Sequence, residues 1–288
     1  MNSFHPFPKV LFYISFFLFA GRGQAQARSA IVPPEPGAAL LSKAVDRHPM
    51  RGLSGRPAML TSGTIGLSEA IQTPGGPEPI GRVQATEKPE TFRRKGYTLI
   101  FESNDGQLDP AVKKRMIDTF FDVYPRLAET FNPKTLREVH FMVDTAYKGV
   151  AATSNGKVVF AAHWLQTRPE DIDVVTHEVM HIVQDYGRSV GPGWLTEGIA
   201  DYVRYRFGVD NAGAKWALPA YKAEQSYKNS YRITARFFVW IESKVKEGVI
   251  VTVDKSLRDH SYTPAIWEKL TGKDLDALWQ AYSANPEL

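Results

Sequence analysis

After residue 27 of this chain of 288 residues, the distribution of aromatic residues separates two parts that differ in their capacity to fold. Between Arg28 and Thr91 there is no Phe, Tyr or Trp, and proline and glycine recur throughout. Such a segment cannot bury enough apolar surface to offset the conformational entropy that folding removes. Residues 28–91 are therefore predicted to be a flexible extension or a pro-segment, and residues 92–288 a folded domain.

The first 27 residues have the pattern of a secretory signal peptide. Lys9 precedes an apolar run over Val10–Ala20, and Ala25 and Ala27 provide the small residues of a cleavage site. The apolar run is too short to cross the hydrocarbon core of a membrane, which is ~30 Å thick. We therefore expect a secreted or periplasmic protein with no stable membrane insertion after the signal has been removed.

The composition limits the kinds of chemistry that the chain can support. It contains no cysteine, which excludes disulfide scaffolds, thiolate metal sites and cysteine nucleophiles, so any metal must be held by histidine and carboxylate side chains. The formal charge of +4 falls to +2 when Lys9 and Arg22 are removed with the signal. No basic stripe is present, so we expect no nucleic-acid partner.

Apolar periodicity after Phe92 predicts an α+β fold, with a small mixed sheet followed by a mainly helical half. Runs of β-forming residues indicate the strands, and Asp109 followed by Pro110 suits the start of a helix. The predicted strands are 97–101, 139–143 and 157–162, the last at a sheet edge, and the predicted helices are 110–131, 169–186, 228–245, 265–270 and 275–282.

An H-E-x-x-H motif lies at His177–His181, inside the predicted helix 169–186. Histidines at positions i and i+4 project from one helical face, so their ring nitrogens can converge on one zinc ion (Zn²⁺) while Glu178 reaches a water on the metal. The alternative is a surface helix with two solvated histidines. The apolar residues around the motif, such as Val179, indicate instead a buried helix whose polar side chains need partners.

A catalytic zinc ion has three protein ligands and one open position, so a third ligand must be found. The extended motif with a third histidine is absent, because Gln184 and Gly187 occupy its glycine and histidine positions. Glu197 follows a Gly/Pro-rich turn near the start of a second helix, which could bring it against the two histidines. Asp201, one turn later, is well placed to accept a hydrogen bond from the ring N–H of a ligand histidine that does not face the metal. Two alternatives stay open: Glu197 as a charge favoured by the helix dipole, and Asp201 as the ligand.

The motif and the run W-L-T-E-G-I-A-D at 194–201 resemble zinc peptidases with a glutamate as third ligand, such as thermolysin-like enzymes and zinc aminopeptidases. The chain is more similar to the plant basic secretory proteins and their bacterial relatives, a metallopeptidase family. The resemblance implies a gluzincin-like (zincin-like) fold, one zinc ion and secretion. Members often carry cysteines that this chain lacks, so no disulfide is transferred. The resemblance rests on residues 177–187, 191–204 and 230–238, and it extends over roughly 92–282.

Together these features predict a secreted zinc metallopeptidase with a peptide or protein substrate. Zinc held by His177, His181 and Glu197 would lower the pKa of its bound water to ~7, and Glu178 would act as general base. The resemblance implies Tyr231 as donor to the developing oxyanion, since the relatives carry a tyrosine there; a core aromatic is the alternative. Further candidates for this donor are Tyr202, Tyr205 and Tyr227.

Two other functions stay open. One is a zinc exopeptidase, although the sequence shows no motif for the fixed charge that would bind a substrate terminus. The other is an exported non-catalytic zinc-binding or defence-related protein, which the presence of Glu178 argues against. In either peptidase, the predicted edge strand 157–162 could pair with an extended substrate.

Overall fold

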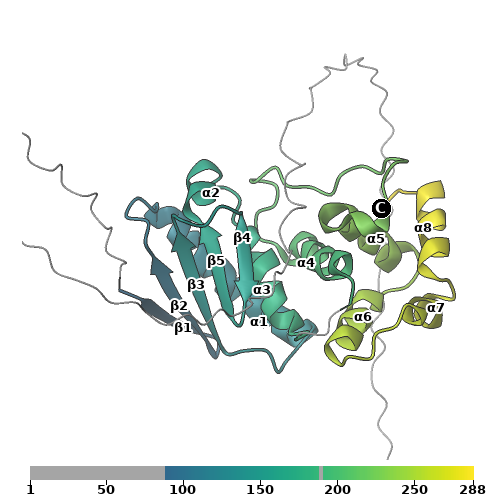
Figure 1. The fold of residues 1–288 in the computed structure, drawn as a ribbon, viewed down its shortest axis with the longest axis horizontal. Helices are drawn as coiled ribbons and strands as arrows, with labels where there is room; N and C mark the ends of the chain where they lie inside the picture. The colour runs from purple at the N-terminus through teal and green to yellow at the C-terminus, as the bar shows by residue number, and fades with distance from the viewer. Residues whose placement is uncertain (1–87, 188–190) are drawn as a thin grey trace, which may run out of the picture. The chain divides into compact units, whose positions relative to one another are not determined.

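The structure is a computed structural model that describes residues 88–187 and 191–288. The predicted signal peptide, 1–27, and residues 28–87 of the predicted extension lie outside the described residues. A five-stranded mixed sheet forms the first half and helices form the second, which confirms the α+β prediction (Figure 1). Within the described residues, no helix combines the length and the apolar character needed to cross a membrane.

The sheet has the strand order β1-β2-β3-β5-β4. Its three inner strands run parallel, and an antiparallel strand flanks them on each side. Alternate residues of β2 and β3 are buried, as expected for strands that pack one face on a core. The strands are β1 (Glu90–Arg94), β2 (Tyr97–Ser103), β3 (Glu138–Asp144), β4 (Ala151–Ser154) and β5 (Lys157–Ala161).

The prediction that 157–162 forms an edge strand is wrong. β5 lies between β3 and β4, and β4 is the edge. The sequence of β4, Ala-Ala-Thr-Ser, lacks the large branched and aromatic residues that mark strands. The turn that joins β4 to β5 was the available signal: Asn155 and Gly156 both have positive φ, 50° and 74°, as a two-residue hairpin turn requires.

Helix α1 (Pro110–Thr130) covers one face of the sheet and confirms the prediction for 110–131. The Asp109 side chain caps its start by accepting from the amide of Ala111 at 2.7 Å. Its buried stripe meets the sheet through Phe120, whose ring centre lies 5.6 Å from that of Phe141 on β3. This packing forms the core beneath the sheet.

The motif helix α3 (Val174–Gln184) begins five residues later than predicted, because residues 169–170 and 172–173 form turns instead of helix. The short helix α2 (Ala162–Thr167) ends just before this segment, and the hydroxyl of its last residue, Thr167, donates to the carbonyl of His163 at 2.8 Å. The buried Asp173 side chain precedes α3 and accepts from the Thr176 hydroxyl at 2.8 Å. It fixes the first turn of the motif helix.

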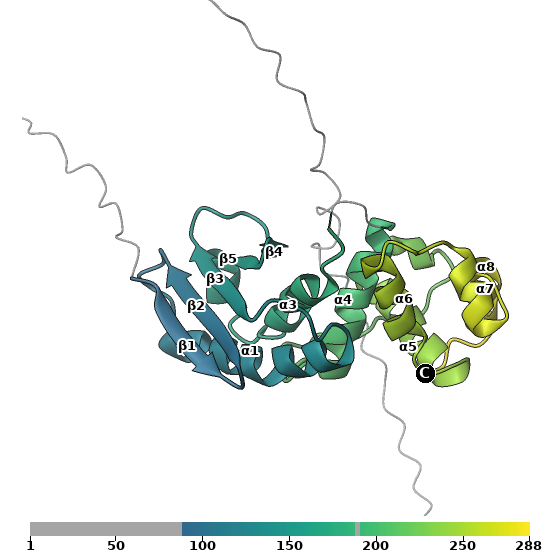
Figure 2. The ribbon, with the colours of Figure 1, turned by 90° about the horizontal axis from the view of Figure 1, so that it is seen from below.

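The remaining helices extend away from the sheet, with α3 and α4 between the sheet and the C-terminal helices (Figures 1 and 2). These helices are α4 (Gly193–Phe207), η1 (Tyr227–Asn229), α5 (Tyr231–Lys244), α6 (Val249–Arg258), α7 (Ala265–Thr271) and α8 (Leu275–Ala284). The helix predicted at 228–245 begins at Tyr231, after the short 3₁₀ turn η1, and α6 was not predicted.

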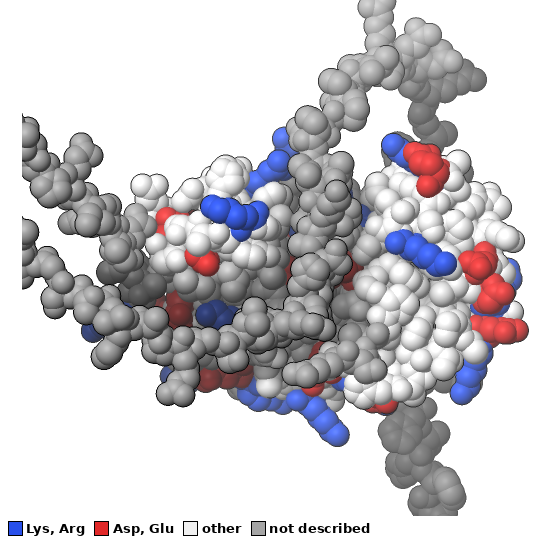
Figure 3. Space-filling model, viewed as in Figure 1, with Lys and Arg blue, Asp and Glu red and all other residues white. Residues whose placement is uncertain are grey.

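Positive and negative side chains are interspersed over the face drawn in Figure 3.

A buried polar network joins α6 to the end of the motif helix. The Arg258 guanidinium lies 2.8 Å from the Asp254 carboxylate and also donates to the carbonyls of Val183, at 3.3 Å, and Phe131, at 2.6 Å. The Tyr186 hydroxyl donates to Asp254 at 2.7 Å. Burial raises the pKa of the Asp254 carboxyl to about 6, although Arg258 opposes the shift.

We expect Arg258→Ala to lower the free energy of unfolding by about 3–5 kcal/mol, because the substitution leaves Asp254 buried without its counter-charge. Urea unfolding at neutral pH measures this loss. Lys255→Ala is the matched control, since Lys255 forms an exposed ion pair with Asp259 on the same helix and should cost at most about 1 kcal/mol. Equal losses in the two variants would contradict the prediction.

Candidate metal centre

Three side chains from α3 and α4 converge on one point. His177 and His181 lie one turn apart on α3, and their Nε2 atoms are 3.2 Å apart. Glu197, in the first turns of α4, places Oε2 at 3.3 Å from Nε2 of His177 and 3.6 Å from Nε2 of His181. Among the described residues, this is the group of histidine and carboxylate side chains with the spacing of a metal site.

In each histidine, Nδ1, the ring nitrogen that points away from Glu197, has a partner of its own. Nδ1 of His177 lies 2.7 Å from Oδ1 of Asp201, and Nδ1 of His181 lies 2.7 Å from Oε1 of Gln184. The Gln184 amide nitrogen donates to the carbonyl of Thr196 at 2.9 Å, so its oxygen is the atom that faces His181. Both Nδ1 atoms are therefore donors, so in the neutral form of each imidazole the lone pair is on Nε2, the atom that faces Glu197.

Three acceptor atoms facing one another require a positive charge between them. The same carboxylates favour a positive charge on the ring: burial opposes protonation of His177, but Asp201 and Glu197 outweigh it and raise the pKa of His177 to about 10. Burial likewise works against ionisation of Glu197, but the two imidazoles hold the pKa of Glu197 well below its usual range. This site is built to stabilise a cation.

The spacing of the donor atoms fits zinc. Ligands at about 2.0–2.2 Å from a tetrahedral zinc ion are about 3.3–3.6 Å from one another. The three separations of 3.2, 3.3 and 3.6 Å match that edge length. Asp201 contacts His177 at Nδ1, on the edge of the ring that points away from Glu197. It is therefore not placed to replace Glu197 as the third ligand.

The carboxylate of Glu178 lies beside this cluster and is held by the sheet. Glu178 is 6% exposed, and its Oε2 lies 2.7 Å from the hydroxyl of Thr153 on the edge strand β4. The same hydroxyl is 3.0 Å from the backbone carbonyl of Glu178. Thr153 was not predicted as a site residue, because nothing in its local sequence indicates that β4 reaches α3.

Tyr231 faces the cluster from the start of α5. Its ring is stacked on His177 with centres 6.2 Å apart, and it is 44% exposed, which excludes the alternative of a core aromatic. Ser230 and Tyr231 have φ of 70° and 48°, in a region that residues other than glycine rarely adopt outside strained or functional sites. Burial and the nearby carboxylates, first Glu197, raise the pKa of the Tyr231 hydroxyl to about 12, so it stays a donor.

The other candidate tyrosines are not placed as donors in this way. Tyr202 and Tyr227 are buried, and the Tyr227 hydroxyl donates to Asp276 at 2.8 Å. Tyr205 is exposed on α4, and no contact with the cluster is seen for it. Tyr231 is therefore the phenol of this group that the fold brings to the histidines.

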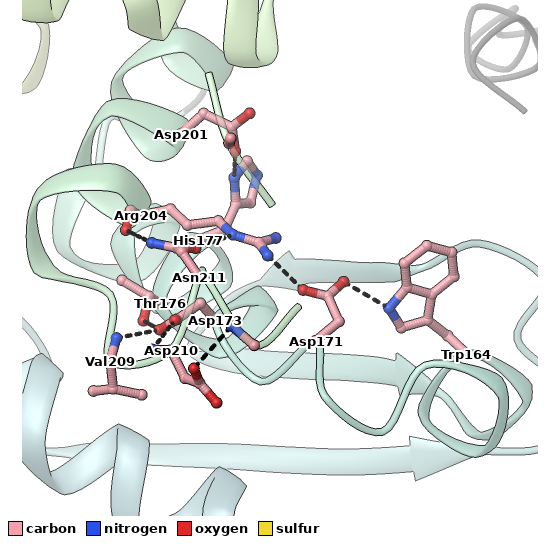
Figure 4. A network of polar contacts seen from close by, with 12 residues as sticks. Trp164, Asp171, Asp173, Thr176, His177, Asp201, Arg204, Val209, Asp210 and Asn211 are labelled. Atoms are coloured by element: carbon pink, nitrogen blue, oxygen red, sulfur yellow. Dashed lines mark hydrogen bonds and ion pairs between the residues drawn. The ribbon is translucent and has the colours of Figure 1, made fainter. Parts of the chain in front are cut away.

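A polar network fixes α3 relative to α4 (Figure 4). Arg204 on α4 forms an ion pair with Asp171, which precedes α3, and Asp171 also accepts from the indole of Trp164 at 3.0 Å. The two carboxylate oxygens of Asp173 accept from the amides of Val209, at 2.8 Å, and Asp210, at 2.6 Å, in the loop after α4. These bonds hold the two histidines and Glu197 in register.

The close packing of α5 against α4 depends on a glycine. A Cβ atom at Gly198, next to Glu197, would lie 2.3 Å from Cγ2 of Thr234 on α5. Only glycine therefore lets α5 pack close enough to bring Tyr231 to His177.

The α+β fold, with a buried H-E-x-x-H helix and a glutamate from the next helix, defines the zincin-like class of domains. The model of the BSP family, described as peptidase of plants and bacteria, matches residues 93–282, and the chain belongs to this family. The resemblance seen in the sequence is thereby confirmed. No curated protein sequence matches the chain.

Several solved structures are similar to part of this chain. Aminopeptidase A of Legionella pneumophila, in complex with aspartic acid, is 16% identical with a TM-score of 0.46, covering 68% of this chain and 27% of that one. An aminopeptidase N family protein from Idiomarina loihiensis is 11% identical with a TM-score of 0.36, covering 70% and 44%. An M1 zinc metallopeptidase from Deinococcus radiodurans is 14% identical with a TM-score of 0.35, covering 71% and 48%. This chain spans less than half the length of each.

Proposed function

We propose that this protein is an exported, zinc-dependent metallopeptidase that hydrolyses internal peptide bonds. The observation that carries the proposal is the convergence of three acceptor atoms, from His177, His181 and Glu197, beside the buried carboxylate of Glu178. A structural zinc site has no use for such a carboxylate. Membership of a peptidase family supports the reaction, and the signal-like pattern at residues 1–27 supports export.

In this proposal, His177, His181 and Glu197 hold the zinc ion, while Asp201 and Gln184 keep the two imidazoles in the tautomer that presents Nε2. When bound, zinc supplies a Lewis acid that polarises the scissile carbonyl and acidifies water. Each outer partner also restrains the rotation of its imidazole ring.

Glu178 takes a proton from the attacking water and returns it to the leaving amine nitrogen. The Thr153 hydroxyl, 2.7 Å from the Glu178 carboxylate, holds that carboxylate in position. The Tyr231 hydroxyl donates a hydrogen bond to the oxygen on which negative charge develops. Its half-exposed position above His177 supports this role.

The edge strand β4 supplies a place for an extended peptide to pair, because its outer side has no neighbouring strand among the described residues. This role belonged to 157–162 in the sequence-based prediction and moves to β4 with the edge. Thr153 lies on β4 and contacts Glu178, so a paired peptide would lie beside the general base.

The test is zinc content and proteolysis of the chain without residues 1–27. We expect one zinc ion per chain, cleavage of casein, loss of cleavage after chelation and recovery on adding zinc. Internal cleavage of end-blocked peptides separates this activity from that of an exopeptidase. Zinc binding without any cleavage would instead favour the non-catalytic alternative.

Gln184 offers a test of the metal site that does not depend on activity. We expect Gln184→Leu to weaken zinc binding by about 10–100-fold, because His181 loses the partner that fixes its tautomer. Competition with a chromogenic chelator measures this affinity. Gln184→Glu retains an oxygen acceptor for His181 and should keep most of the affinity; wild-type affinity in the leucine variant would contradict the assignment.

A further inference from the structure

The hydrogen-bond pattern of β4 shows which of its backbone groups face outward. The amide of Ala161 donates to the carbonyl of Val150 at 3.0 Å, and bonding alternates along an antiparallel pair. The backbone groups of Ala152 therefore face β5, whereas those of Ala151 and Thr153 face the free edge. A peptide that adds to this edge has two residues with which to exchange hydrogen bonds, and Thr153 is the one beside Glu178.

The outward carbonyl of Ala151 already has a partner. The hydroxyl of Tyr147, in the loop between β3 and β4, donates to this carbonyl at 3.2 Å. Burial, and then the charge of Glu178, raise the pKa of the Tyr147 hydroxyl, so it remains a donor. The phenol of Tyr147 thus covers the Ala151 end of the free β4 edge, within reach of the charge of Glu178.

A glycine makes this position of the Tyr147 ring possible. A Cβ atom at Gly149 would lie 2.7 Å from the Tyr147 hydroxyl oxygen and 2.9 Å from two ring carbons. The φ of Gly149 is not positive, so alanine is compatible with the backbone at this position. Alanine there would only push the end of the Tyr147 ring away from Ala151.

We propose that Tyr147 closes the β4 edge at Ala151 and limits how far a peptide substrate can pair beyond Thr153. This inference rests on the proposed peptidase function. In antiparallel pairing, the peptide residue opposite Ala151 lies two positions C-terminal to the residue opposite Thr153. For a peptide paired in this way, Tyr147 therefore discriminates against extension at the C-terminal end of the substrate. Displacing the Tyr147 hydroxyl frees the Ala151 carbonyl to accept a hydrogen bond from a longer peptide.

The experiment measures peptide binding in the zinc-loaded Glu178→Gln background, where cleavage does not interfere. The probes are end-blocked, fluorescein-labelled alanine-rich peptides, lengthened one residue at a time at the C-terminal end, and anisotropy reports their affinity. We expect Tyr147→Phe and Gly149→Ala each to tighten binding of the longer peptides by about 2–10-fold, the effect of one hydrogen bond. Affinity for the shortest peptides should stay unchanged.

Tyr221→Phe is the matched control, because this tyrosine packs against Trp279 and Tyr282 of α8. Its affinities should equal those of the Glu178→Gln parent at every length. Equal affinities in all variants, no binding of any peptide, or a gain that is the same for short and long peptides would overturn the role of Tyr147. Failure of the wild-type chain to cleave, with the length-dependent gain still present, would contradict the proposed activity alone.

Discussion

Glu178→Gln is expected to bind zinc as the wild type does and to lose about 10²–10⁴-fold in kcat for peptide hydrolysis, the contribution of a positioned general base. The amide has the same shape as the carboxylate but cannot take a proton from water. Thr153 can still hydrogen-bond to the amide oxygen, so the helix and the three metal ligands keep their positions. Zinc content, measured by atomic absorption, and kcat for one peptide give the two readouts.

Glu170→Gln is the matched control for this variant. Glu170 is exposed in the turn before α3, so the same chemical change there should leave both zinc content and kcat as in the wild type. Cleavage by Glu178→Gln at the wild-type rate would show that another group acts as base. Loss of zinc together with activity would instead show that Glu178 helps to hold the site.

Glu197→Ala is expected to weaken zinc binding by more than about 100-fold, beyond the effect of losing an outer partner of a ligand. The substitution removes one of three donors and leaves two imidazole nitrogens 3.2 Å apart without the carboxylate that attracts a cation. Chelator competition measures the affinity, and cleavage should fall in parallel.

Asp201→Asn is the comparison for Glu197→Ala. Asp201 contacts Nδ1 of His177, so its loss should cost about 10–100-fold in affinity, as for the outer partner of a ligand histidine. If Glu197→Ala retained wild-type affinity and Asp201→Asn lost zinc, the third ligand would be Asp201. The fold argues against that outcome, because the Asp201 carboxylate lies on the far edge of the His177 ring.

Much of the fold could be predicted where the signal is local. The cap at Asp109 and the apolar stripe of α1 depend on residues within one helix, so the prediction for 110–131 agrees with the structure almost to the residue. The strands that became β2 and β3 have strong β-forming residues and were found. β4 was missed because a strand of small and polar residues is stabilised by its neighbour rather than by its own propensity.

The candidate site also contains residues that a local sequence signal could predict and residues that it could not. His177, Glu178 and His181 are placed by the pitch of one helix, so their spacing predicts a metal-binding face before any tertiary contact is known. Glu197 and Asp201 could be proposed because their helix follows α3 closely in the sequence. Thr153 on β4 and Tyr147 in the loop before it could not be predicted, because the presence of a strand at 151–154 was not evident from its sequence.

The sequence by itself determined which side chains could hold a metal ion, since a chain without cysteine and with an i, i+4 pair of histidines leaves histidine and carboxylate as the candidate ligands. It also determined that, after the predicted signal peptide, only the residues beyond 91 include the aromatic side chains for a core. Only the tertiary structure decided the surroundings of the site: the Gln184 partner of His181, the Thr153 contact to Glu178 and the tyrosine over Ala151. The Thr153 contact joins β4 to α3, and the Gln184 amide is oriented by a carbonyl of α4, so this geometry depends on how the sheet and helices pack.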